Sequence, residues 1–346
     1  MKNDDVPAVL ACVSHSPLIA IRPRAPLQEP AIKQHCSAVR TMVDAFAPER
    51  IVFFTNNHFA GFHYSNMPAY CVGTQCRAVA DLGGTAGEIP VPDGDSIALI
   101  EFLREEGFDP GVSYKMSVDH AVSQPLTRLL GGIDRFPLIP VFISVFTPPL
   151  MRFKRSRLIG EAVGRWIVAQ RKPTLIMGSG GLSHHPARYF PLMGTADPLV
   201  HGYQLDGERG GTMTDKEWFT RFADMHTTGA QTLADGQRTA QDLRLNPTFD
   251  EDVLGRLAAG DLASMDDWEP QDLMERAGLG SLELHLWIAA VAAHRTASGT
   301  RDLSQFYAPT LEYGTGYATL YSSDSIPLPS VSVATRYGDT SGSGEQ

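Results

Sequence analysis

Short, mainly apolar segments alternate with longer amphipathic segments through the first half of this 346-residue chain. An apolar run without polar alternation is typical of a strand buried on both faces, whereas apolar residues spaced three and four apart are typical of a helix. The predicted strands are 9–13, 50–55, 137–145 and 174–177, and the predicted helices are 31–46, 95–106 and 155–169. This alternation predicts an α/β fold in which a central, largely buried sheet is flanked by helices.

The second half of the chain suggests how the fold is completed within a single domain. Residues 198–244 are polar with helical spacing, so we expect a helical insertion packed on the core. Residues 281–294, SLELHLWIAAVAAH, predict a strongly apolar helix. After residue 322 the chain is rich in Ser, Pro and Gly and has no periodicity. We therefore expect a domain over residues 1–322 and a flexible tail over 323–346.

Composition excludes several classes of partner. The formal net charge of -10 argues against nucleic acid and anionic membranes, because both require clustered Lys and Arg. No run of 18 uncharged apolar residues is present, and the N-terminus does not have the pattern of a secretory signal. The four cysteines form no CxxC pair and are too few for a disulfide scaffold. These features favour a cytoplasmic protein that acts on a small molecule.

Histidines follow three of the predicted strands directly. His15 follows the first strand, His58 the second, and His184 the strand over 174–177; His120 lies in the segment SVDHAVSQP. A single histidine in such a place is more often a hydrogen-bonded loop residue than a ligand. Ligands of open α/β sheets bind at the carboxyl ends of strands, however, and three such histidines could converge there. Two imidazoles and one carboxylate form a facial triad that leaves metal positions open for substrate and dioxygen.

The glycine-rich segment 178–181, GSGG, precedes His184. It lacks both the GKS/T ending and the GxGxxG spacing of nucleotide-binding loops. We therefore expect it to allow a tight turn and close approach of the backbone to a ligand.

Six segments taken together resemble the class III extradiol dioxygenases. They are SHSP (14–17), NHFAGFHY (57–64), MP (67–68), GEIPVP (87–92), VDHAVSQPL (118–126) and GSGGLSHHP (178–186). Any one of these motifs alone is weak, but their combination in this order is specific. The resemblance extends over nearly the whole chain, up to about residue 320, and implies a single α/β catalytic domain.

The resemblance also implies a chemistry and a set of roles. Fe(II) would be held by His15 and His58, His184 would be the base that removes a catechol proton, and His120 the acid that assists ring opening. The reaction would be extradiol cleavage of a catechol with an acidic side chain, such as 2,3-dihydroxyphenylpropionate. Both atoms of O2 would be incorporated, and we expect the enzyme to be a homo-oligomer.

The chain departs from the family pattern at the second histidine ligand. Family members usually carry an acid before this histidine, and here the pair is Asn57-His58. A neutral amide in place of a carboxylate that orients the imidazole is expected to weaken metal affinity or to shift specificity.

A second departure concerns the carboxylate ligand. Many relatives supply it as Glu in an Asn-x-Glu-aromatic-Asp segment, but Thr248 occupies that position here. Asp250 is the first candidate for the third metal ligand, with Glu251 and Glu283 behind it. An equally good interpretation of Asp250 is an N-cap for a helix that begins near Glu251.

Other functions remain open at this stage. The same chemistry could act on a gallate-like or aminophenol-like ring, and Arg22 and Arg24 could bind a substrate carboxylate or lie in a solvated loop. A non-catalytic binding protein of the same fold would have no use for both His120 and His184. A zinc-dependent hydrolase would share the ligand types.

Overall fold

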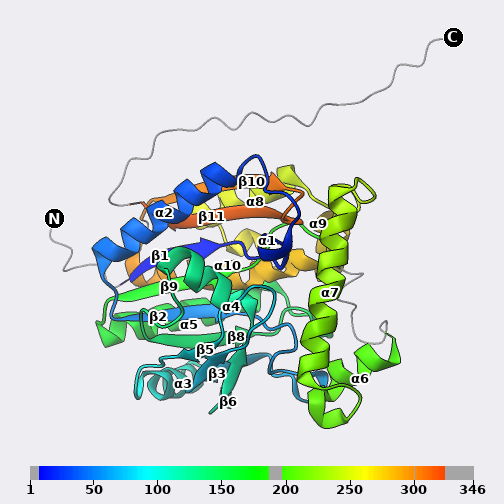
Figure 1. Ribbon diagram of the computed structural model, residues 1–346. Helices are drawn as coiled ribbons and strands as arrows, with labels where there is room; N and C mark the ends of the chain where they lie inside the picture. Colours follow the sequence, from blue (N-terminus) through cyan, green and yellow to red (C-terminus); the bar gives the residue numbers. More distant parts are fainter. Residues whose placement is uncertain (1–7, 187–196, 300, 324–346) are drawn as a thin grey trace.

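An eight-stranded sheet runs through the centre of the protein (Figure 1). The computed structural model describes residues 8–186, 197–299 and 301–323. Across the sheet the strands are ordered β10 (Leu303–Thr310), β11 (Thr315–Ser322), β1 (Ala8–Val13), β9 (Thr174–Ser179), β2 (Arg50–Thr55), β8 (Leu138–Ile143), β3 (Tyr70–Gly73) and β6 (Gly111–Ser113). This sheet with its flanking helices confirms the predicted α/β class.

The four central strands, β1, β9, β2 and β8, are parallel to one another, and every residue in them is buried. Their mainly apolar sequences follow from this position, since helices cover a parallel sheet on both faces. β11 and β3 border this parallel core as antiparallel neighbours of β1 and β8. The carboxyl ends of β1, β9 and β2 consequently lie side by side at one edge, which is where ligands bind in open α/β sheets.

Alternate residues of β1 enter two different hydrophobic cores. Leu10 packs in one core with helices α5 (Phe153–Gln170) and α10 (Leu284–Ser298), and Val9 packs in the other with α2 (Glu29–Phe46). The predicted apolar helix over 281–294 thus corresponds to α10, which is buried from its first residue through His294. A short 3-10 turn, η6 (Leu279–Glu283), precedes it.

Two glycines allow α5 to lie unusually close to α10. A Cβ added to Gly160 would lie 2.3 Å from the Ala289 carbonyl oxygen, and one added to Gly164 would lie 2.5 Å from that of Ala293. Both positions therefore need glycine for steric reasons. The close contact determines how deeply α10 sits against the sheet, and with it the position of the residues just before the helix.

The remaining elements are shorter or lie in the second half of the chain. A three-stranded sheet has the order β5 (Gly87–Ile89), β4 (Cys76–Ala78) and β7 (Met116–Val118). The other helices are α1 (Leu18–Ile21), α3 (Asp95–Glu105), α4 (His120–Pro125), α6 (Pro198–Asp206), α7 (Asp215–Ala234), α8 (Pro247–Ala259) and α9 (Pro270–Ala277). The single-turn elements are η2 (Tyr64–Asn66), the π-helical η3 (Leu126–Leu130), η4 (Gly207–Gly210) and η5 (Ala263–Met265).

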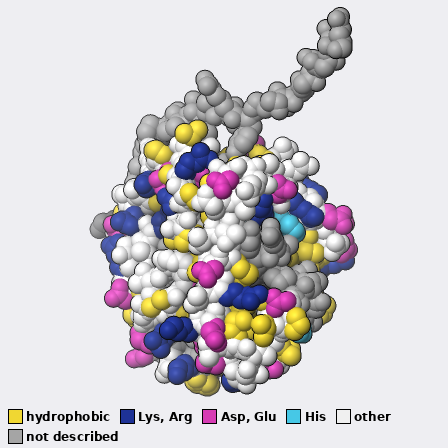
Figure 2. Space-filling model, turned by 45° about the vertical axis from the view of Figure 1, so that its right-hand side comes forward, with side chains coloured by type: hydrophobic (Ala, Val, Ile, Leu, Met, Phe, Trp, Pro, Cys, Tyr) yellow, Lys and Arg dark blue, Asp and Glu magenta, His cyan; other side chains and the backbone are white. Residues whose placement is uncertain are grey.

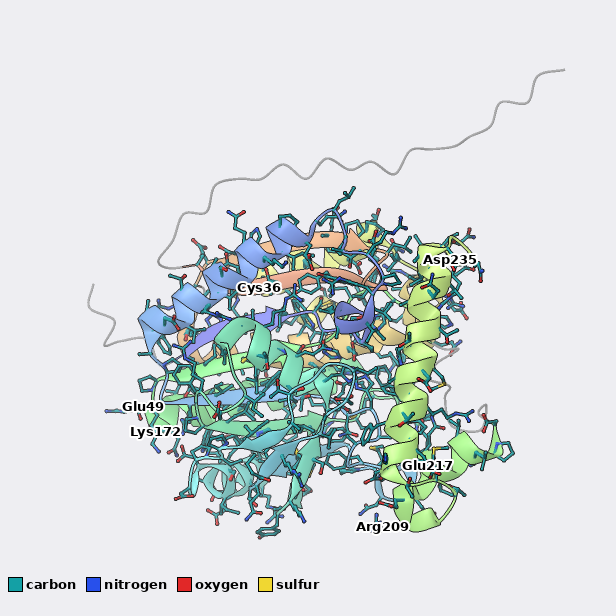
Figure 3. The ribbon with its side chains drawn as sticks, in the orientation of Figure 1. Cys36, Glu49, Lys172, Arg209, Glu217 and Asp235 are labelled. Atoms are coloured by element: carbon teal, nitrogen blue, oxygen red, sulfur yellow. The ribbon has the colours of Figure 1, made fainter. Side chains whose placement is uncertain are left out.

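Helices α6 and α7 occupy most of the segment predicted to be a helical insertion and stand at one side of the sheet (Figure 1). Figure 3 marks the two ends of α7 by Glu217 and Asp235. Thr214 and Glu217 form a reciprocal capping box that starts this helix. The predicted tail lies outside the described residues from 324 onward.

Helix α8 begins earlier than predicted. Asn246 caps it by accepting a hydrogen bond from the Phe249 N–H, and Pro247 takes the first helical position. Asp250 is therefore inside the helix, and the interpretation of Asp250 as the cap of a helix starting near Glu251 is wrong.

Charged side chains of both signs are interspersed over the face shown in Figure 2. A mixed surface of this kind offers no basic patch for a polyanion on that face. Among the described helices, none combines the length and the apolarity needed to cross a bilayer.

A buried histidine between α5 and α10 is expected to make the fold sensitive to acid. Nδ1 of His285 lies 2.7 Å from Ser156 Oγ, and burial lowers the pKa of His285 to about 3. Between the ordinary pKa of histidine, about 6.5, and pH 3, the unfolded chain binds a proton that the folded chain does not. The free energy of unfolding should therefore fall as pH falls through this window.

The variant His285→Gln retains a polar group for Ser156 but cannot take up this proton. We expect its urea midpoint to change less between pH 7 and pH 5 than that of the wild type. His201→Gln, on the half-buried face of α6, is the control and should keep the wild-type slope. Equal losses of stability in all three proteins would show that His285 does not contribute to the acid sensitivity.

Candidate active site

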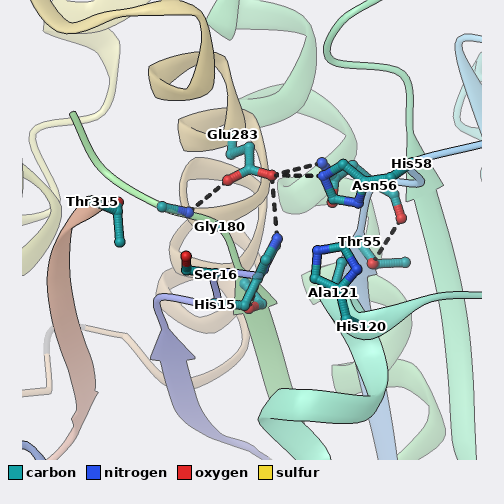
Figure 4. A network of polar contacts seen from close by, with 12 residues as sticks. His15, Ser16, Thr55, Asn56, His58, His120, Ala121, Gly180, Glu283 and Thr315 are labelled. Carbon is teal, nitrogen blue, oxygen red and sulfur yellow. Dashed lines mark hydrogen bonds and ion pairs between the residues drawn. The ribbon is translucent and has the colours of Figure 1, made fainter. Parts of the chain in front are cut away.

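His15 extends from the carboxyl end of β1 toward Glu283, the residue directly before α10. Its Nδ1 lies 2.9 Å from Ser179 Oγ, and this hydroxyl donates its own hydrogen to the Val13 carbonyl. Ser179 must therefore accept from His15, so Nδ1 carries the proton and Nε2 has a free lone pair. Nε2 lies 3.3 Å from Oε1 of Glu283 (Figure 4).

His58 approaches the same carboxylate from the loop after β2. Its Nε2 lies 3.7 Å from Glu283 Oε1, and its Nδ1 lies 3.3 Å from Oδ2 of Asp119. Burial disfavours a charge on this ring, but Asp119 and Glu283 outweigh it and raise the pKa of His58 to about 10. The electrostatic field at this point thus favours a positive charge.

Asn57 does not leave His58 without a carboxylate. Its Oδ1 accepts the backbone N–H of Ala60 and its Nδ2 donates to the Ser117 carbonyl, so the amide serves the local turn. The carboxylate that orients His58 comes instead from Asp119 in the VDH motif, which also accepts the His58 backbone N–H at 2.6 Å. The expected weakening through Asn57 is therefore not supported by the geometry.

His120 stands at the start of α4, stacked on His58 with ring centroids 4.6 Å apart. Its Nδ1 lies 2.5 Å from Oδ2 of Asp81, a buried acid that follows β4. Nε2 is buried and has no hydrogen-bond partner in the described part of the chain. Asp81 was not among the residues predicted from the sequence, although the adjacent Gly83 and Gly84 indicate a tight turn that could aim it.

His184 lies in the loop after β9. Its Nδ1 lies 2.9 Å from the Leu182 carbonyl, which can only accept, so Nε2 again carries the free lone pair. This Nε2 is 3.9 Å from Oε2 of Glu283, and burial lowers the pKa of His184. Glycine is required opposite the ring, because a Cβ on Gly280 would lie 2.0 Å from it. The neighbouring His185 accepts the Leu279 N–H through its Nδ1 and lines the same pocket as His184.

Glu283 is the centre of this arrangement. It is buried at the junction of η6 and α10, where Oε1 accepts from Asn56 Nδ2 at 2.8 Å and Oε2 accepts from the Gly181 N–H at 2.6 Å. Burial opposes its ionisation, but the facing histidines hold the pKa of Glu283 well below its usual value. A buried carboxylate that stays ionised among imidazoles is the arrangement expected of a metal site.

The glycines of the segment GSGG are needed mainly for close packing against the junction of η6 and α10, and less for contact with a ligand. A Cβ on Gly178 would lie 2.7 Å from the Leu286 carbonyl of α10, and one on Gly180 would lie 2.5 Å from the Cβ of Glu283. These glycines allow α10 to bring its first residues against the end of β9.

Asp250, the first candidate for the third ligand, is engaged elsewhere. Its Oδ1 accepts from the Ser183 N–H, and its Oδ2 accepts from the hydroxyls of Ser183 and Tyr307 at 2.6 and 2.8 Å. Burial raises the pKa of Asp250 to about 7. Glu251 is exposed on α8. The geometry thus favours Glu283, the last of the three candidates, over both.

The donor set fits a divalent metal ion. One ring nitrogen from each of His15, His58 and His120 lies within 4.8 Å of the others, and Glu283 Oε1 faces two of these rings. Separations of 3.3 and 3.7 Å are compatible with donors that share one ion at about 2.0–2.2 Å. Imidazoles with one carboxylate are the ligands of non-haem iron sites.

A pocket of about 720 Å³, counted out to its open mouth, adjoins these side chains. Its polar lining includes His15, His58, His184 and Glu283. Its apolar lining includes Leu18, Phe146, Phe222, Leu233 and Leu243. An aromatic ring could lie against the apolar walls with its hydroxyls toward the histidines and the carboxylate.

Arg22 and Arg24 are not among the described residues that line this pocket. Arg22 pairs with Glu29 and lies over the ring of Tyr313. Arg24 donates to the Ala234 carbonyl on the surface. The pocket is lined instead by Arg238, which sequence analysis did not single out.

Comparison with known proteins matches nearly the whole chain. The family model described as the catalytic LigB subunit of aromatic ring-opening dioxygenase matches residues 9–317. A protein named 2,3-dihydroxyphenylpropionate/2,3-dihydroxicinnamic acid 1,2-dioxygenase from Escherichia coli O8 is 34% identical over 313 residues, which cover 90% of this chain and 98% of the relative. The protein of the same name from Escherichia coli K12 / DH10B has the same identity and coverage. A solved structure, that of uncharacterized protein JW3007 from Escherichia coli K12, covers 90% of this chain with a TM-score of 0.43 and 11% identity.

Proposed function

This chain belongs to the LigB family of aromatic ring-opening dioxygenases, and we propose that it uses Fe(II) and O2 to cleave a catechol ring next to its two hydroxyls, with incorporation of both oxygen atoms. The observation that carries this proposal is the convergence of His15, His58 and Glu283. A hydrogen bond from Nδ1 of His15 to Ser179, and the Asp119 carboxylate 3.3 Å from Nδ1 of His58, leave Nε2 of both rings facing the same carboxylate.

We assign the three ligands to His15, His58 and Glu283, in place of the earlier candidate Asp250. Ser179 and Asp119 would hold the two rings in the tautomer that binds a metal. Fe(II), when bound, would supply Lewis acidity toward the catechol and an electron path between catechol and dioxygen.

His184 is the proposed base. Burial keeps its imidazole neutral near pH 7, and the Leu182 carbonyl holds the proton on Nδ1. Nε2 is therefore free to take a proton from a catechol hydroxyl in the adjoining pocket.

His120 is the proposed acid. Its Nδ1 is tied to Asp81, and its buried Nε2 belongs to the same group of ring nitrogens as those of His15 and His58. A proton on Nε2 could be delivered to the oxygen released from the oxygen–oxygen bond as that bond is cleaved, and both oxygen atoms stay in the product. A binding protein without catalysis would not need two such histidines.

The substrate is proposed to be a catechol that carries an acidic side chain, of the 2,3-dihydroxyphenylpropionate type. The names of the curated relatives support this choice, and so does the arginine in an otherwise apolar part of the pocket. A gallate-like or aminophenol-like ring is the second candidate.

Anaerobic loading with Fe(II), followed by a screen of substituted catechols in air, tests the proposed reaction. We expect yellow ring-opened products from 3-substituted catechols and O2 uptake equal to the catechol consumed. Loading with Zn(II) is the control and should give no product. Activity restored by zinc, without O2 uptake, would contradict the proposal and indicate a hydrolase.

A further inference from the structure

We infer that Arg238 binds the carboxylate at the end of the substrate side chain and thereby selects acidic catechols over uncharged ones. This inference rests on the proposed function, because it concerns the same pocket. It names a specificity-determining residue where sequence analysis pointed to Arg22 and Arg24.

The composition of the pocket lining supports this role. Arg238 is the one Lys or Arg among the described residues that line the pocket. The polar lining also contains the metal-ligand candidates, His184, Ser16, His185 and His226, and apolar side chains form most of the remainder. A catechol ring directed to the histidines would therefore leave its substituent among apolar walls with a single cationic group within the same cavity.

Backbone hydrogen bonds position Arg238. Its N–H and that of Gln237 both donate to the Thr232 carbonyl, which closes the end of α7. On the other side, the N–H and the hydroxyl of Thr239 both donate to Asp242. The arginine thus projects from a turn that is tied down on both flanks.

The surroundings of the side chain are apolar and partly closed. Leu233 and Leu243, on either side of Arg238 in the sequence, are buried in one small cluster with Leu18, and all three line the pocket. Arg238 is half-buried, and its charge contributes, after burial, Arg244 and His184, to lowering the pKa of His185. The charge of Arg238 therefore acts on His185, the residue next to the proposed base His184.

A guanidinium in such a place has a defined chemical preference. It offers parallel N–H donors that match both oxygens of a carboxylate, and the interaction strengthens where water is partly excluded. An alkyl or neutral polar substituent gains nothing comparable. The geometry of the pocket therefore predicts discrimination by the charge of the side chain and not by its bulk.

Two ligands of similar size separate this role from a structural one: 2,3-dihydroxyphenylpropionate and uncharged 3-propylcatechol. In Arg238→Gln we expect the KM for the acid to rise by about 10- to 100-fold, the usual range for a lost hydrogen bond to a charged group. The KM for 3-propylcatechol should stay within about 2-fold of the wild-type value, since it makes no such bond. Arg238→Lys should recover part of the affinity, and Arg24→Gln, at the surface, should behave as wild type.

The dependence of KM on ionic strength is a second test, because a change in packing alone would not alter it. Added salt should raise the KM for the acid in the wild type and have little effect in Arg238→Gln. Anaerobic titration calorimetry of both ligands with the iron-loaded proteins measures the same preference without turnover.

Equal losses of affinity for the two ligands, or no loss for the acid, would overturn the role of Arg238 and leave the proposed function intact. A wild type that binds the acid but cleaves neither catechol would refute the proposed function, and the binding preference would still decide the role of Arg238.

Discussion

Replacement of Glu283 by Ala should abolish stoichiometric metal binding, whereas replacement of Asp250 by Ala should leave it intact. Glu283 Oε1 faces both His15 and His58, and its loss removes the negative charge among these rings. Loss of an outer residue that merely orients a ligand lowers metal affinity by about 10- to 100-fold, so loss of a direct ligand should lower it by at least about 100-fold. Equilibrium dialysis with Fe(II) under nitrogen, followed by metal analysis, measures the effect.

The Asp250→Ala variant is the matched comparison, because it also removes a buried carboxylate. Three donors from Ser183 and Tyr307 would lose their acceptor, so the free energy of unfolding should fall by about 2–4 kcal/mol while metal affinity is retained. Glu283→Gln keeps the volume of the side chain and should still lose the metal. If Asp250→Ala lost iron although folded and Glu283→Gln kept it, the assignment of the third ligand would have to be reversed.

Replacement of His184 or His120 by Gln should leave the metal bound and suppress turnover by roughly 10²–10⁴-fold, the usual contribution of a positioned acid or base. His184 Nε2 faces the pocket with a free lone pair, and His120 Nε2 lies in the same group of ring nitrogens. His201→Gln is the control, because His201, on α6, is not among the described residues that line the pocket. Single-turnover rates and iron content, measured on the same samples, separate chemistry from metal loss.

The two variants should differ in the step that they impair. Without His184, less of the catechol bound anaerobically should be deprotonated, which is visible as a weaker ultraviolet band of the catechol anion. Without His120, this band should remain while product formation stalls. The wild-type rate should be bell-shaped in pH, and its two limbs belong to the coupled group of histidines and carboxylates. A variant that lost its iron would identify that histidine as a ligand, and full activity of both variants would refute the mechanism.

Much of this fold and half of the site could be predicted from the sequence alone. Strands β1, β2, β8 and β9 are mainly apolar because they are buried on both faces, so their local composition reveals them. His15, His58 and His184 were expected to converge because each directly follows such a strand. Seven strands were missed. β3 to β7 have three or four residues each, too few for a periodic pattern to show. β10 and β11 have eight residues each, but their sequences, LSQFYAPT and TGYATLYS, mix polar with apolar residues and form no apolar run.

Tertiary structure alone decided which carboxylate faces these histidines. Nothing in the sequence around Glu283 distinguishes it as the acid that faces the histidines. It reaches them because Gly178, Gly160 and Gly164 let the following helix, α10, pack closely against β9 and α5. The same holds for the two acids that orient histidines. Asp119 is distant in sequence from His58, and Asp81 is distant in sequence from His120. Asp250 was the first candidate from the sequence, but its position inside α8 commits it to Ser183 and Tyr307.

Tertiary structure also determined which arginine lines the pocket. Arg22 and Arg24 follow the SHSP motif closely, yet Arg22 is held by Glu29 and Arg24 by the end of α7. Arg238 is more than 200 residues away from this motif along the chain, and only the packing of α7 beside α1 brings it to the pocket. Buried strands are recognisable from local composition because burial on both faces constrains every residue in them. The partners of a polar group cannot be recognised from local composition, because they depend on where distant segments of the chain pack.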